Sequence, residues 1–528
     1  MNLYDLFAIA ARRSPGKAAL RMPARQAEGA GAEADPRAAA IEWSYAELLA
    51  RADGVAASLR RRGIGYGDRV GCLLGNGPEL VLLHLALLRV GAILVPINLA
   101  YKRREVGHIL ADATPRLLVV EAAQRAVLDE VPAAEQASLE AVLDAGELLR
   151  ASELEPGAAT SNGADSGGAP AASETPAPGG DDLAVLLYTS GTTGTSKGAM
   201  ISHNNVLATV TGLLAAWSWS AGDVLLLALP LFHVHGLVVG LDCALAAGAT
   251  VELRRRFDAA ACAGELAGGG VTLFFGVPTV YVRLVEELRR RGGGPGAYAG
   301  VRLFCSGSAP LAPETFAAFR ELAGQAILER YGMTECGMIL SNPYLGPRVP
   351  GQVGTPLPGV SVRLVDEEGR DLPAGVEGEL LVRGANVFAG YWQAPEKTAA
   401  SFVQDAAGRR WFRTGDLARQ DPRTGAFTLL GRRHELIISG GFNIYPREVE
   451  EALLGFPGVR EAAVVGRPHA EWGEVPIAYL VAEPALEPPA LLAYCKSQLA
   501  AFKVPHEVRL LDALPRNALG KLQKHLLP

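Results

Sequence analysis

Strand-like and helix-like segments alternate along most of this chain, and this alternation constrains its fold more than any other feature. Short apolar runs are each followed by a longer segment with helical spacing, first over residues 44–121 and again over residues 204–322. Ser44 stands where it can cap the first of these helices, over Tyr45–Arg62. Parallel strands are normally joined by such helices, so the pattern predicts an α/β fold with a mostly parallel sheet.

Length and local pattern indicate more than one domain. At 528 residues the chain exceeds what one hydrophobic core normally serves. Residues 351–391 are typical of short strands with turns, which predicts a small β subdomain. The segment from about residue 435 has an α+β pattern of its own. We therefore expect a large N-terminal domain over residues 1–432 and a small, mobile C-terminal domain over residues 433–528.

Residues 151–181 interrupt the alternation. The run from Gly157 to Gly180 has no aliphatic side chain larger than alanine and cannot contribute much to a core. It could be a domain linker. Because the strands on both sides look like parts of similar sheets, we favour a disordered insertion within the large domain. Residues 24–39 are rich in alanine, glycine and charge, and we expect a disordered surface loop there.

The composition is that of an ordinary globular protein and argues against several functions. Hydrophobic residues make up 49% and charged residues 20%, and the net charge of −6 disfavours a general nucleic-acid binder. The six cysteines show no CxxC spacing, so we expect reduced thiols in a cytoplasmic protein. The most apolar stretch, residues 80–99, carries His84 and Arg89, and we expect neither a signal peptide nor a membrane span.

The segment Tyr188–Gly198, YTSGTTGTSKG, has the features of a polyphosphate-binding loop. The apolar run LAVLLYT leads directly into it. Its glycines let backbone N–H groups approach an anion, its hydroxyls add donors, and Lys197 adds a positive charge. A flexible surface loop is the alternative, although such a loop seldom follows a buried strand directly. The spacing does not match the GxxxxGK[ST] of P-loop NTPases.

Further motifs extend this pattern through the chain: SGSAPL at residues 306–311, ERYGMTE at 329–335, TGD at 414–416 and PRNALGKLQK at 515–524. Together with the phosphate loop, they resemble the adenylate-forming superfamily of acyl-CoA synthetases, luciferases and peptide-synthetase adenylation domains. The resemblance covers nearly the whole chain. It implies an enzyme that uses ATP and Mg²⁺ to join a carboxylic acid to coenzyme A through an acyl-adenylate.

The resemblance also implies a nucleotide site. The residues expected to bind ATP or AMP are Thr189, Ser190, Gly191, Thr192, Thr193, Gly194, Lys197, Ser308, Ala309, Pro310, Arg330, Tyr331, Gly332, Met333, Thr334, Asp416, Arg432 and Lys521. Asp416 would accept hydrogen bonds from the ribose hydroxyls. Glu335 would bind Mg²⁺, with Thr192 as a weaker metal candidate. The alternative for Thr334 and Glu335 is an ordinary helix start.

The last motif supplies the expected catalytic lysine. Lys521, carried by the small domain, would neutralise the charge that develops between the attacking carboxylate and the α-phosphate. A solvated lysine is the alternative. The expected catalytic residues are Lys521, Lys197, Glu335, Thr334 and His233. The family usually has Asp or Lys at the domain hinge, where this chain has His434, and we expect the small domain to rotate near this residue.

SGGFNIYP, from Ser439 to Pro446, resembles the segment that lines the pantetheine path in acyl-CoA synthetases. The residues expected to contact coenzyme A are Ser439, Gly440, Gly441, Arg467 and Lys503.

The acid is the least constrained part of the prediction. Arg283, one helical turn beyond Thr279 in an apolar helix, would be a buried guanidinium that clamps the second carboxylate of a short diacid. A solvent-facing arginine is the alternative. The residues expected to line the acyl site are Arg283, His233, His235 and Met333.

RYGMTE, SNPY, VPTVYVRL and FHVHG resemble malonyl-CoA synthetases rather than long-chain enzymes, which implies malonate as the acid. A monocarboxylate ligase and a non-catalytic nucleotide-binding or acyl-binding paralogue are the alternatives. We expect small-molecule partners and a monomer or homodimer, with no nucleic acid and no membrane.

Overall fold

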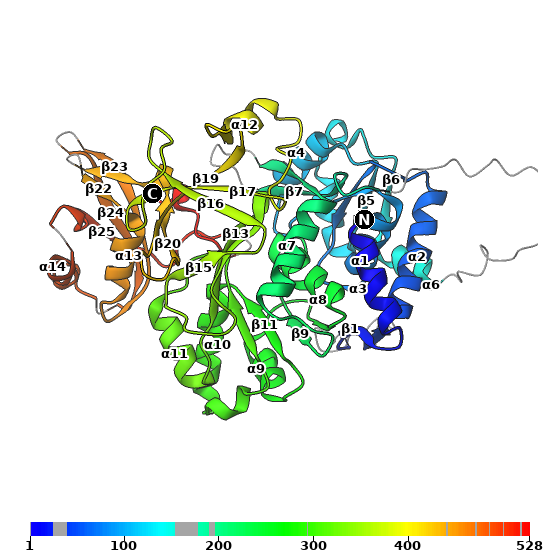
Figure 1. Cartoon of the computed structure of the whole chain (residues 1–528), viewed down its shortest axis with the longest axis horizontal. Coiled ribbons are helices and arrows are strands. Elements are labelled where there is room, and N and C mark those ends of the chain that lie inside the picture. Colours follow the sequence, from blue (N-terminus) through cyan, green and yellow to red (C-terminus); the bar gives the residue numbers. More distant parts are fainter. Residues whose placement is uncertain are drawn as a thin grey trace, which may run out of the picture.

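A computed structural model gives the structure of the protein. It describes residues 2–24, 40–153, 178–189, 196–292, 294–439, 442–469, 472–484, 486–499, 501–517 and 520–528. Within these residues the strands form three sheets, two in the large domain and one in the small domain (Figure 1). The expected loop over residues 24–39 falls, apart from its first residue, outside the described residues.

The first sheet has the order β6-β5-β3-β4-β7-β8 and is parallel except for the β7–β8 pairing. Its strands are β3 (Arg69–Leu73), β4 (Ile93–Pro96), β5 (Leu117–Val120), β6 (Ala141–Asp144), β7 (Leu183–Thr189) and β8 (Lys197–Ser202). β6 and β7 flank the compositional break at residues 151–181, so the chain on both sides belongs to one sheet. Residues 151–153 are the end of helix α6 rather than inserted loop, and residues 154–177 lie outside the described residues.

The second sheet is parallel from β1 through β10, β9, β11 and β12 to β13, and it is antiparallel on both sides of this part. Its order is β16-β17-β19-β20-β15-β14-β13-β12-β11-β9-β10-β1-β2, with β18 paired to β19. Its strands are β1 (Ala18–Met22), β2 (Ile41–Ser44), β9 (Val224–Leu227), β10 (Thr250–Leu253), β11 (Leu273–Gly276), β12 (Leu303–Ser306), β13 (Leu328–Met333), β14 (Gly337–Ser341), β15 (Gln352–Pro356), β16 (Val360–Val365), β17 (Glu377–Gly384), β18 (Phe402–Gln404), β19 (Arg410–Gln420) and β20 (Phe427–Arg432). The antiparallel part contains the expected small β subdomain.

Helices fill the space between the two sheets and cover their outer faces. The helices of the large domain are α1 (Leu3–Arg13), α2 (Tyr45–Arg61), α3 (Pro78–Val90), α4 (Arg103–Ala113), α5 (Arg125–Asp129), α6 (Ala145–Glu153), α7 (His203–Ala216), a π-helix (His235–Asp242), α8 (Cys243–Ala247), α9 (Ala259–Ala267), α10 (Pro278–Arg291), α11 (Pro313–Ala323) and α12 (Pro395–Ala400). One core joins both sheets through α1–α3, α7, the π-helix and α8, while α4 and α5 cover the first sheet and α9–α11 the second. The large domain is therefore layered as α/β/α/β/α.

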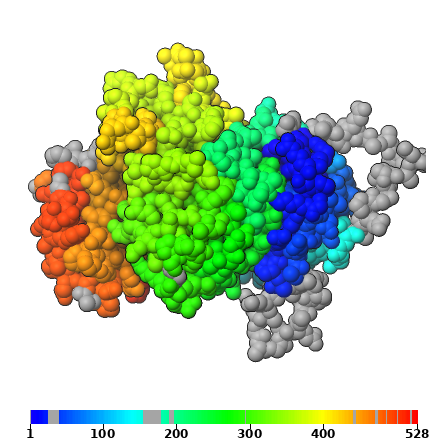
Figure 2. Space-filling view, turned by 60° about the horizontal axis from the view of Figure 1, so that its bottom comes forward, coloured from blue at the N-terminus to red at the C-terminus, as the bar shows by residue number. Residues whose placement is uncertain are grey.

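The small domain sits at one end of the molecule in both views (Figure 1; Figure 2). It has a five-stranded sheet with its own apolar core. Its elements are β21 (Ile437–Ser439), β22 (Phe442–Ile444), α13 (Pro446–Leu454), β23 (Val459–His469), β24 (Gly473–Ala482), α14 (Pro488–Gln498) and β25 (Glu507–Leu510). This is the expected α+β unit.

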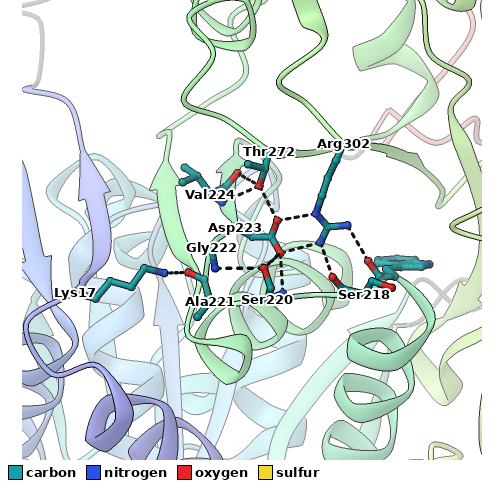
Figure 3. A network of polar contacts seen from close by, with 10 residues as sticks. Lys17, Ser218, Ser220, Ala221, Gly222, Asp223, Val224, Thr272 and Arg302 are labelled. Carbon is teal, nitrogen blue, oxygen red and sulfur yellow. Dashed lines mark hydrogen bonds and ion pairs between the residues drawn. The ribbon is translucent and has the colours of Figure 1, made fainter.

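A buried ion pair ties the loop between α7 and β9 to the start of two core strands. Figure 3 shows Asp223 between Arg302 and Thr272. Arg302 binds both carboxylate oxygens, with Nε 2.7 Å from Oδ1 and Nη2 2.8 Å from Oδ2, and the Thr272 hydroxyl donates to Oδ1 over 2.9 Å. A bidentate guanidinium fixes the carboxylate in direction as well as distance. This network joins Thr272 and Arg302, the residues that directly precede β11 and β12, to the start of β9.

The cysteines agree with the expectation of reduced thiols. All six cysteines are buried and free. Among the described residues, none of the helices combines the length and the apolarity that a membrane crossing requires.

Candidate active site

The predicted phosphate loop joins the two strands of an antiparallel hairpin. Thr189, the last residue of β7, pairs with Lys197, the first residue of β8. The loop residues themselves, Ser190, Gly191, Thr192, Thr193 and Gly194, lie outside the described residues, so their roles and the metal role of Thr192 stay predictions. A hairpin distinguishes this loop from a P-loop, which connects a strand to a helix.

Glu335 lies buried beside Lys197, with Tyr391 between them. The Tyr391 hydroxyl donates to Glu335 Oε1 over 2.9 Å, and Lys197 Nζ is 5.2 Å from the centre of the Tyr391 ring. Burial lowers the pKa of Lys197, as does Lys397 of α12, whereas Glu335 acts in the opposite direction. A cation and a carboxylate therefore stand together at the end of the phosphate loop.

The environment of Glu335 fits Mg²⁺ in the way that nucleotide enzymes bind it. Among the described residues no group of three or more His, Cys, Asp and Glu side chains could hold a metal ion by itself. Mg²⁺ in such enzymes is held by one or two carboxylates together with substrate phosphates. A single carboxylate beside Lys197 matches that arrangement, so Glu335 remains the residue that would hold the ion.

Asp416 and Arg432 face each other across β19 and β20. Arg432 Nε lies 3.0 Å from Asp416 Oδ1, and the Tyr331 hydroxyl donates to the other carboxylate oxygen. Burial raises the pKa of Asp416, and the nearby Arg432 partly offsets this effect. All three residues were predicted to contact the nucleotide. The structure brings them together, although the Tyr331 hydroxyl is already engaged by Asp416.

Lys521 reaches this group from the small domain. It follows Gly520, whose N–H donates to the Asn517 carbonyl over 2.8 Å, and its own N–H donates to Asn517 Oδ1 over 2.9 Å. Lys521 is exposed as a residue, yet protein surrounds its ammonium closely enough to lower its pKa, first by loss of water and then by Arg432. Glu335 is also near enough to act on it. The predicted catalytic residues of both domains thus meet in one place.

The loop after β12 carries three residues that were predicted to bind the nucleotide. Ser308 is half-buried with a positive φ of 70°, and Ala309 and Pro310 are exposed. The Ser308 hydroxyl lies 3.2 Å from His235 Nδ1. Gly332, Met333 and Thr334, which end β13 and begin a 3₁₀ turn over Thr334–Cys336, are half-buried and so remain accessible to a ligand.

His233 and His235 stand next to a buried arginine, Arg330. The His235 N–H donates to His233 Nδ1 over 3.2 Å. Burial, then Arg330 and Lys521, lower the pKa of His233 to about 4, and burial and Arg330 take the pKa of His235 well below its ordinary value. Both imidazoles are therefore neutral at pH 7. His233 is thus within electrostatic range of both Arg330 and Lys521.

Arg330 is 4% exposed, and the part of the chain that the structure describes offers its charge no carboxylate partner. Its Nε and Nη2 have no hydrogen-bond partner, and none of the described carboxylates forms an ion pair with it. Its near neighbours are the thiol of Cys305, the phenol of Tyr281 and the backbone of Gly307, where a Cβ would lie 2.4 Å from the guanidinium carbon. The sequence prediction assigned Arg330 to the nucleotide and did not foresee this burial.

Arg283 is exposed on α10, so the expected buried guanidinium at this position is wrong. The apolar positions of α10 that face the core are Tyr281, Leu284, Val285 and Leu288. Arg283 lies between them in sequence but on the other face of the helix. Among the described residues it has no hydrogen-bond or ion-pair partner.

Two of the residues expected to contact coenzyme A form their hydrogen bonds and ion pairs within the small domain. Arg467 donates to the carbonyls of Leu527 and Pro528, and Lys503 pairs with Glu448 at 2.6 Å. Ser439 is buried on β21. Gly440 and Gly441 lie outside the described residues, as does the side chain of the expected hinge residue, His434, so their roles stay predictions.

Tyr391 was missed by sequence reasoning, although it orients Glu335 and contacts Lys197. Its only signal is its place after a glycine at the end of the predicted β subdomain. No spacing rule shows that a residue 56 positions after Glu335 donates to it.

The profile of the AMP-binding enzyme family matches residues 7–392, and that of the AMP-binding enzyme C-terminal domain matches residues 448–521. The chain belongs to this family. Together with the relatives and solved structures described next, the match shows that the chain is an AMP-forming acyl-CoA ligase that works through an acyl-adenylate, with ATP and coenzyme A as substrates.

Relatives within the family differ in substrate. The chain is 37% identical over 485 residues to a sulfoacetate–CoA ligase of Cupriavidus necator, covering 91% of both proteins. It is 39% identical over 378 residues to the mitochondrial malonate–CoA ligase ACSF3 of Mus musculus, covering 65% of this chain and 64% of the relative. It is 34% identical over 528 residues to an indoleacetate–CoA ligase of Aromatoleum aromaticum, covering 99% and 97%.

Solved structures agree with the fold over the whole chain. ATP-bound MatB from Rhodopseudomonas palustris, at 39% identity, superposes with a TM-score of 0.86 and covers 100% of this chain and 98% of that one. The apo form of the same protein gives a TM-score of 0.76 at the same coverage. The arrangement of this chain is therefore more like the ATP-bound form.

Proposed function

We propose that this ligase activates a short acid that carries a second anionic group, with malonate as the first candidate, and transfers it to coenzyme A. The observation that carries the proposal is the buried guanidinium of Arg330, which lacks a carboxylate partner among the described residues and acts on the neighbouring His233.

A buried cation without a counterion is strongly unfavourable, because burial removes the water that stabilises it. Arg330 would be compensated when the second anionic group of a substrate binds, and an arginine is well suited to grip a carboxylate with two N–H donors. A fatty acid brings no such group. Malonate and sulfoacetate, the substrates named for two of the relatives, each have a second anionic group two bonds from the reacting carboxylate.

The neighbouring residues suit the first half-reaction. A carboxylate oxygen attacks the α-phosphorus of ATP, the bond from that phosphorus to the bridging oxygen breaks, and pyrophosphate leaves. Lys521 would neutralise the charge that builds up on the α-phosphate oxygens. Asp416 would hold the ribose, and Glu335 would hold Mg²⁺, which would neutralise the phosphates. His233 is neutral, so it leaves the attacking carboxylate unprotonated and can donate a hydrogen bond to it.

The second half-reaction requires a thiol where Lys521 now stands. We propose that the small domain, residues 433–528, turns near His434 and presents the coenzyme A path of residues 439–446. The sulfur of coenzyme A then attacks the acyl carbon and AMP leaves. The greater similarity to the ATP-bound neighbour than to its apo form supports assigning the present arrangement to adenylate formation.

A monocarboxylate ligase is the second candidate, because an indoleacetate–CoA ligase and a feruloyl-CoA synthase are also among the relatives. A non-catalytic binding protein is disfavoured, since Lys197, Glu335, Asp416 and Lys521 are all present and gathered at one site.

A panel of acids tests the proposal. Malonate, methylmalonate, succinate, sulfoacetate and butyrate are each supplied with ATP, Mg²⁺ and coenzyme A, and AMP release is followed. We expect kcat/KM for malonate to exceed that for butyrate by about 100-fold or more, because butyrate leaves the guanidinium unpaired. A preference for butyrate over every acid with a second anionic group would refute the proposal.

A further inference from the structure

Lys524, three residues after the catalytic lysine, is held between two carboxylates. Its Nζ lies 2.7 Å from Glu450 Oε1 on α13 and 3.3 Å from Glu435 Oε2 in the 3₁₀ turn Arg433–Glu435. The side chains of Lys524 and Glu450 are 16% and 17% exposed, and that of Glu435 is 32% exposed. Burial disfavours the ammonium, but the two carboxylates outweigh this effect and raise the pKa of Lys524. The Lys524 ammonium thus forms ion pairs with two carboxylates.

Glu450 has a second partner, whereas Glu435 depends on Lys524. The Val464 N–H donates to Glu450 Oε1 over 2.8 Å, which fixes that carboxylate to β23. Among the described residues, Lys524 is the cation that forms an ion pair with Glu435. Loss of the Lys524 charge would therefore leave Glu435 without an ion-pair partner among the described residues, with Arg432 and Lys521 as the remaining cations in electrostatic range.

Glu435 also lies within electrostatic reach of the catalytic centre. It acts on the charge of both Lys521 and Asp416. An uncompensated Glu435 would attract the ammonium of Lys521, which belongs to the same segment as Lys524. An ammonium held by Glu435 could not neutralise the α-phosphate.

We propose that Lys524 is a positioning residue for adenylate formation: by pairing with Glu435 it keeps this carboxylate from capturing Lys521. The inference rests on the acyl-adenylate chemistry of the family and not on the identity of the acid.

The location of the pair predicts which half-reaction depends on it. Arg433 is tied to the large domain, with Nη1 2.8 Å from Glu379 Oε2 on β17, whereas Glu435 is tied to the small domain through Lys524. The pair thus moves with the small domain when that domain turns. Lys521 acts only in adenylate formation, so loss of Lys524 should slow that step and spare thioester formation.

Four variants test the inference: Lys524→Met, Lys524→Arg, Glu435→Gln and the double variant Lys524→Met/Glu435→Gln. Acid-dependent ATP–pyrophosphate exchange measures the first step, with malonate or the acid of the panel that the wild type uses. For the second step, enzyme-bound acyl-adenylate is accumulated in the presence of pyrophosphatase, coenzyme A is added, and AMP release is followed by rapid quench. Lys496→Ala, at an exposed position of α14, is the control and should change neither step.

Lys524→Met should slow exchange by about 10-fold to 100-fold, the cost of a misplaced catalytic group, while thioester formation stays within about 2-fold. Lys524→Arg should keep most of the exchange activity. The double variant should recover most of what Lys524→Met loses, because the neutral amide that replaces the Glu435 carboxylate no longer attracts Lys521. An equal loss in both steps, exchange unchanged in Lys524→Met, or no recovery in the double variant would each overturn the inference. Because all readings are relative to wild-type exchange, they do not depend on malonate being the substrate.

Discussion

The hydroxyl of Tyr391 donates to Oε1 of Glu335 over 2.9 Å, and the face of the same ring lies 5.2 Å from Nζ of Lys197. One aromatic side chain therefore orients the carboxylate that would hold Mg²⁺ and contacts the cation beside the phosphate loop. The Tyr391 N–H in turn donates to the Thr398 hydroxyl of α12 over 2.9 Å. This bond connects α12 to the nucleotide site.

Tyr391→Phe should weaken the binding of MgATP. The substitution keeps the ring beside Lys197 but removes the hydrogen bond to Glu335, a loss of about 1–2 kcal/mol, or about 5-fold to 30-fold in KM for MgATP. KM for the acid should change little. Steady-state kinetics with each substrate varied separately measures both values. Tyr494→Phe on α14 is the matched control, and an unchanged KM for MgATP in Tyr391→Phe would show that Glu335 does not need this bond.

Adenylate formation should fail at alkaline pH as Lys521 loses its proton. Burial and Arg432 lower the pKa of Lys521 below its ordinary value of 10.5, and only the protonated form can neutralise the α-phosphate. Exchange should therefore be highest at lower pH and decline as the pH rises through this lowered pKa. Lys521→Arg should be slower but lack the decline, because a guanidinium stays protonated. An identical alkaline decline in both proteins would mean that another group titrates.

Glu329 should make the fold less stable as the pH rises. Its carboxyl is buried beneath the Gly351 N–H, which donates to Oε1 over 2.9 Å, and burial raises its pKa to about 7 despite this bond and the nearby Arg447. The unfolded chain releases the proton near pH 4.5. The native state thus binds more protons between these values, and the contribution of Glu329 to stability, full below pH 4.5, is lost by about pH 7.

Glu329→Gln, which stays neutral, should remove this loss. Relative to the wild type, its free energy of unfolding should rise by about 1–3 kcal/mol between pH 5 and pH 8 in urea denaturation. The same substitution at the exposed Glu321 of α11 is the control. A pH-independent difference between Glu329→Gln and the wild type would contradict the assignment.

Much of the fold could be predicted because local signals agree with tertiary structure. The Ser44 side chain accepts a hydrogen bond from the Glu47 N–H, and the Glu47 carboxylate accepts one from the Ser44 N–H, as in a capping box. Strands β3 to β5 and helices α3 and α4 followed from apolar periodicity. β8 was not predicted, because the glycine and hydroxyl residues before it hide the start of a six-residue strand. β1 and β2 were also missed, since β1 is completed by pairing with β10, more than two hundred residues away.

Part of the candidate site could also be predicted from the sequence, and part could not. The motifs that contain Lys521, Asp416 and Arg432 could be recognised in the sequence from their residue types. The structure brings these three residues together. Arg283 and Arg330 show the limit of such reasoning. Spacing placed Arg283 near Thr279 but could not show which face of α10 it occupies. Arg330 lacks a carboxylate partner because of the side chains that several elements place around it. No single stretch of the sequence shows which side chains these are.

The most direct test of the account compares Arg330→Met with Arg283→Met, each assayed with malonate and with butyrate by acid-dependent ATP–pyrophosphate exchange. Methionine keeps most of the side-chain volume and removes the charge. The account predicts that Arg330→Met loses malonate exchange by about 100-fold or more while butyrate exchange is kept or improved, and that Arg283→Met retains the preference for malonate. Undiminished malonate exchange in Arg330→Met, or a loss of the malonate preference in Arg283→Met alone, would contradict it.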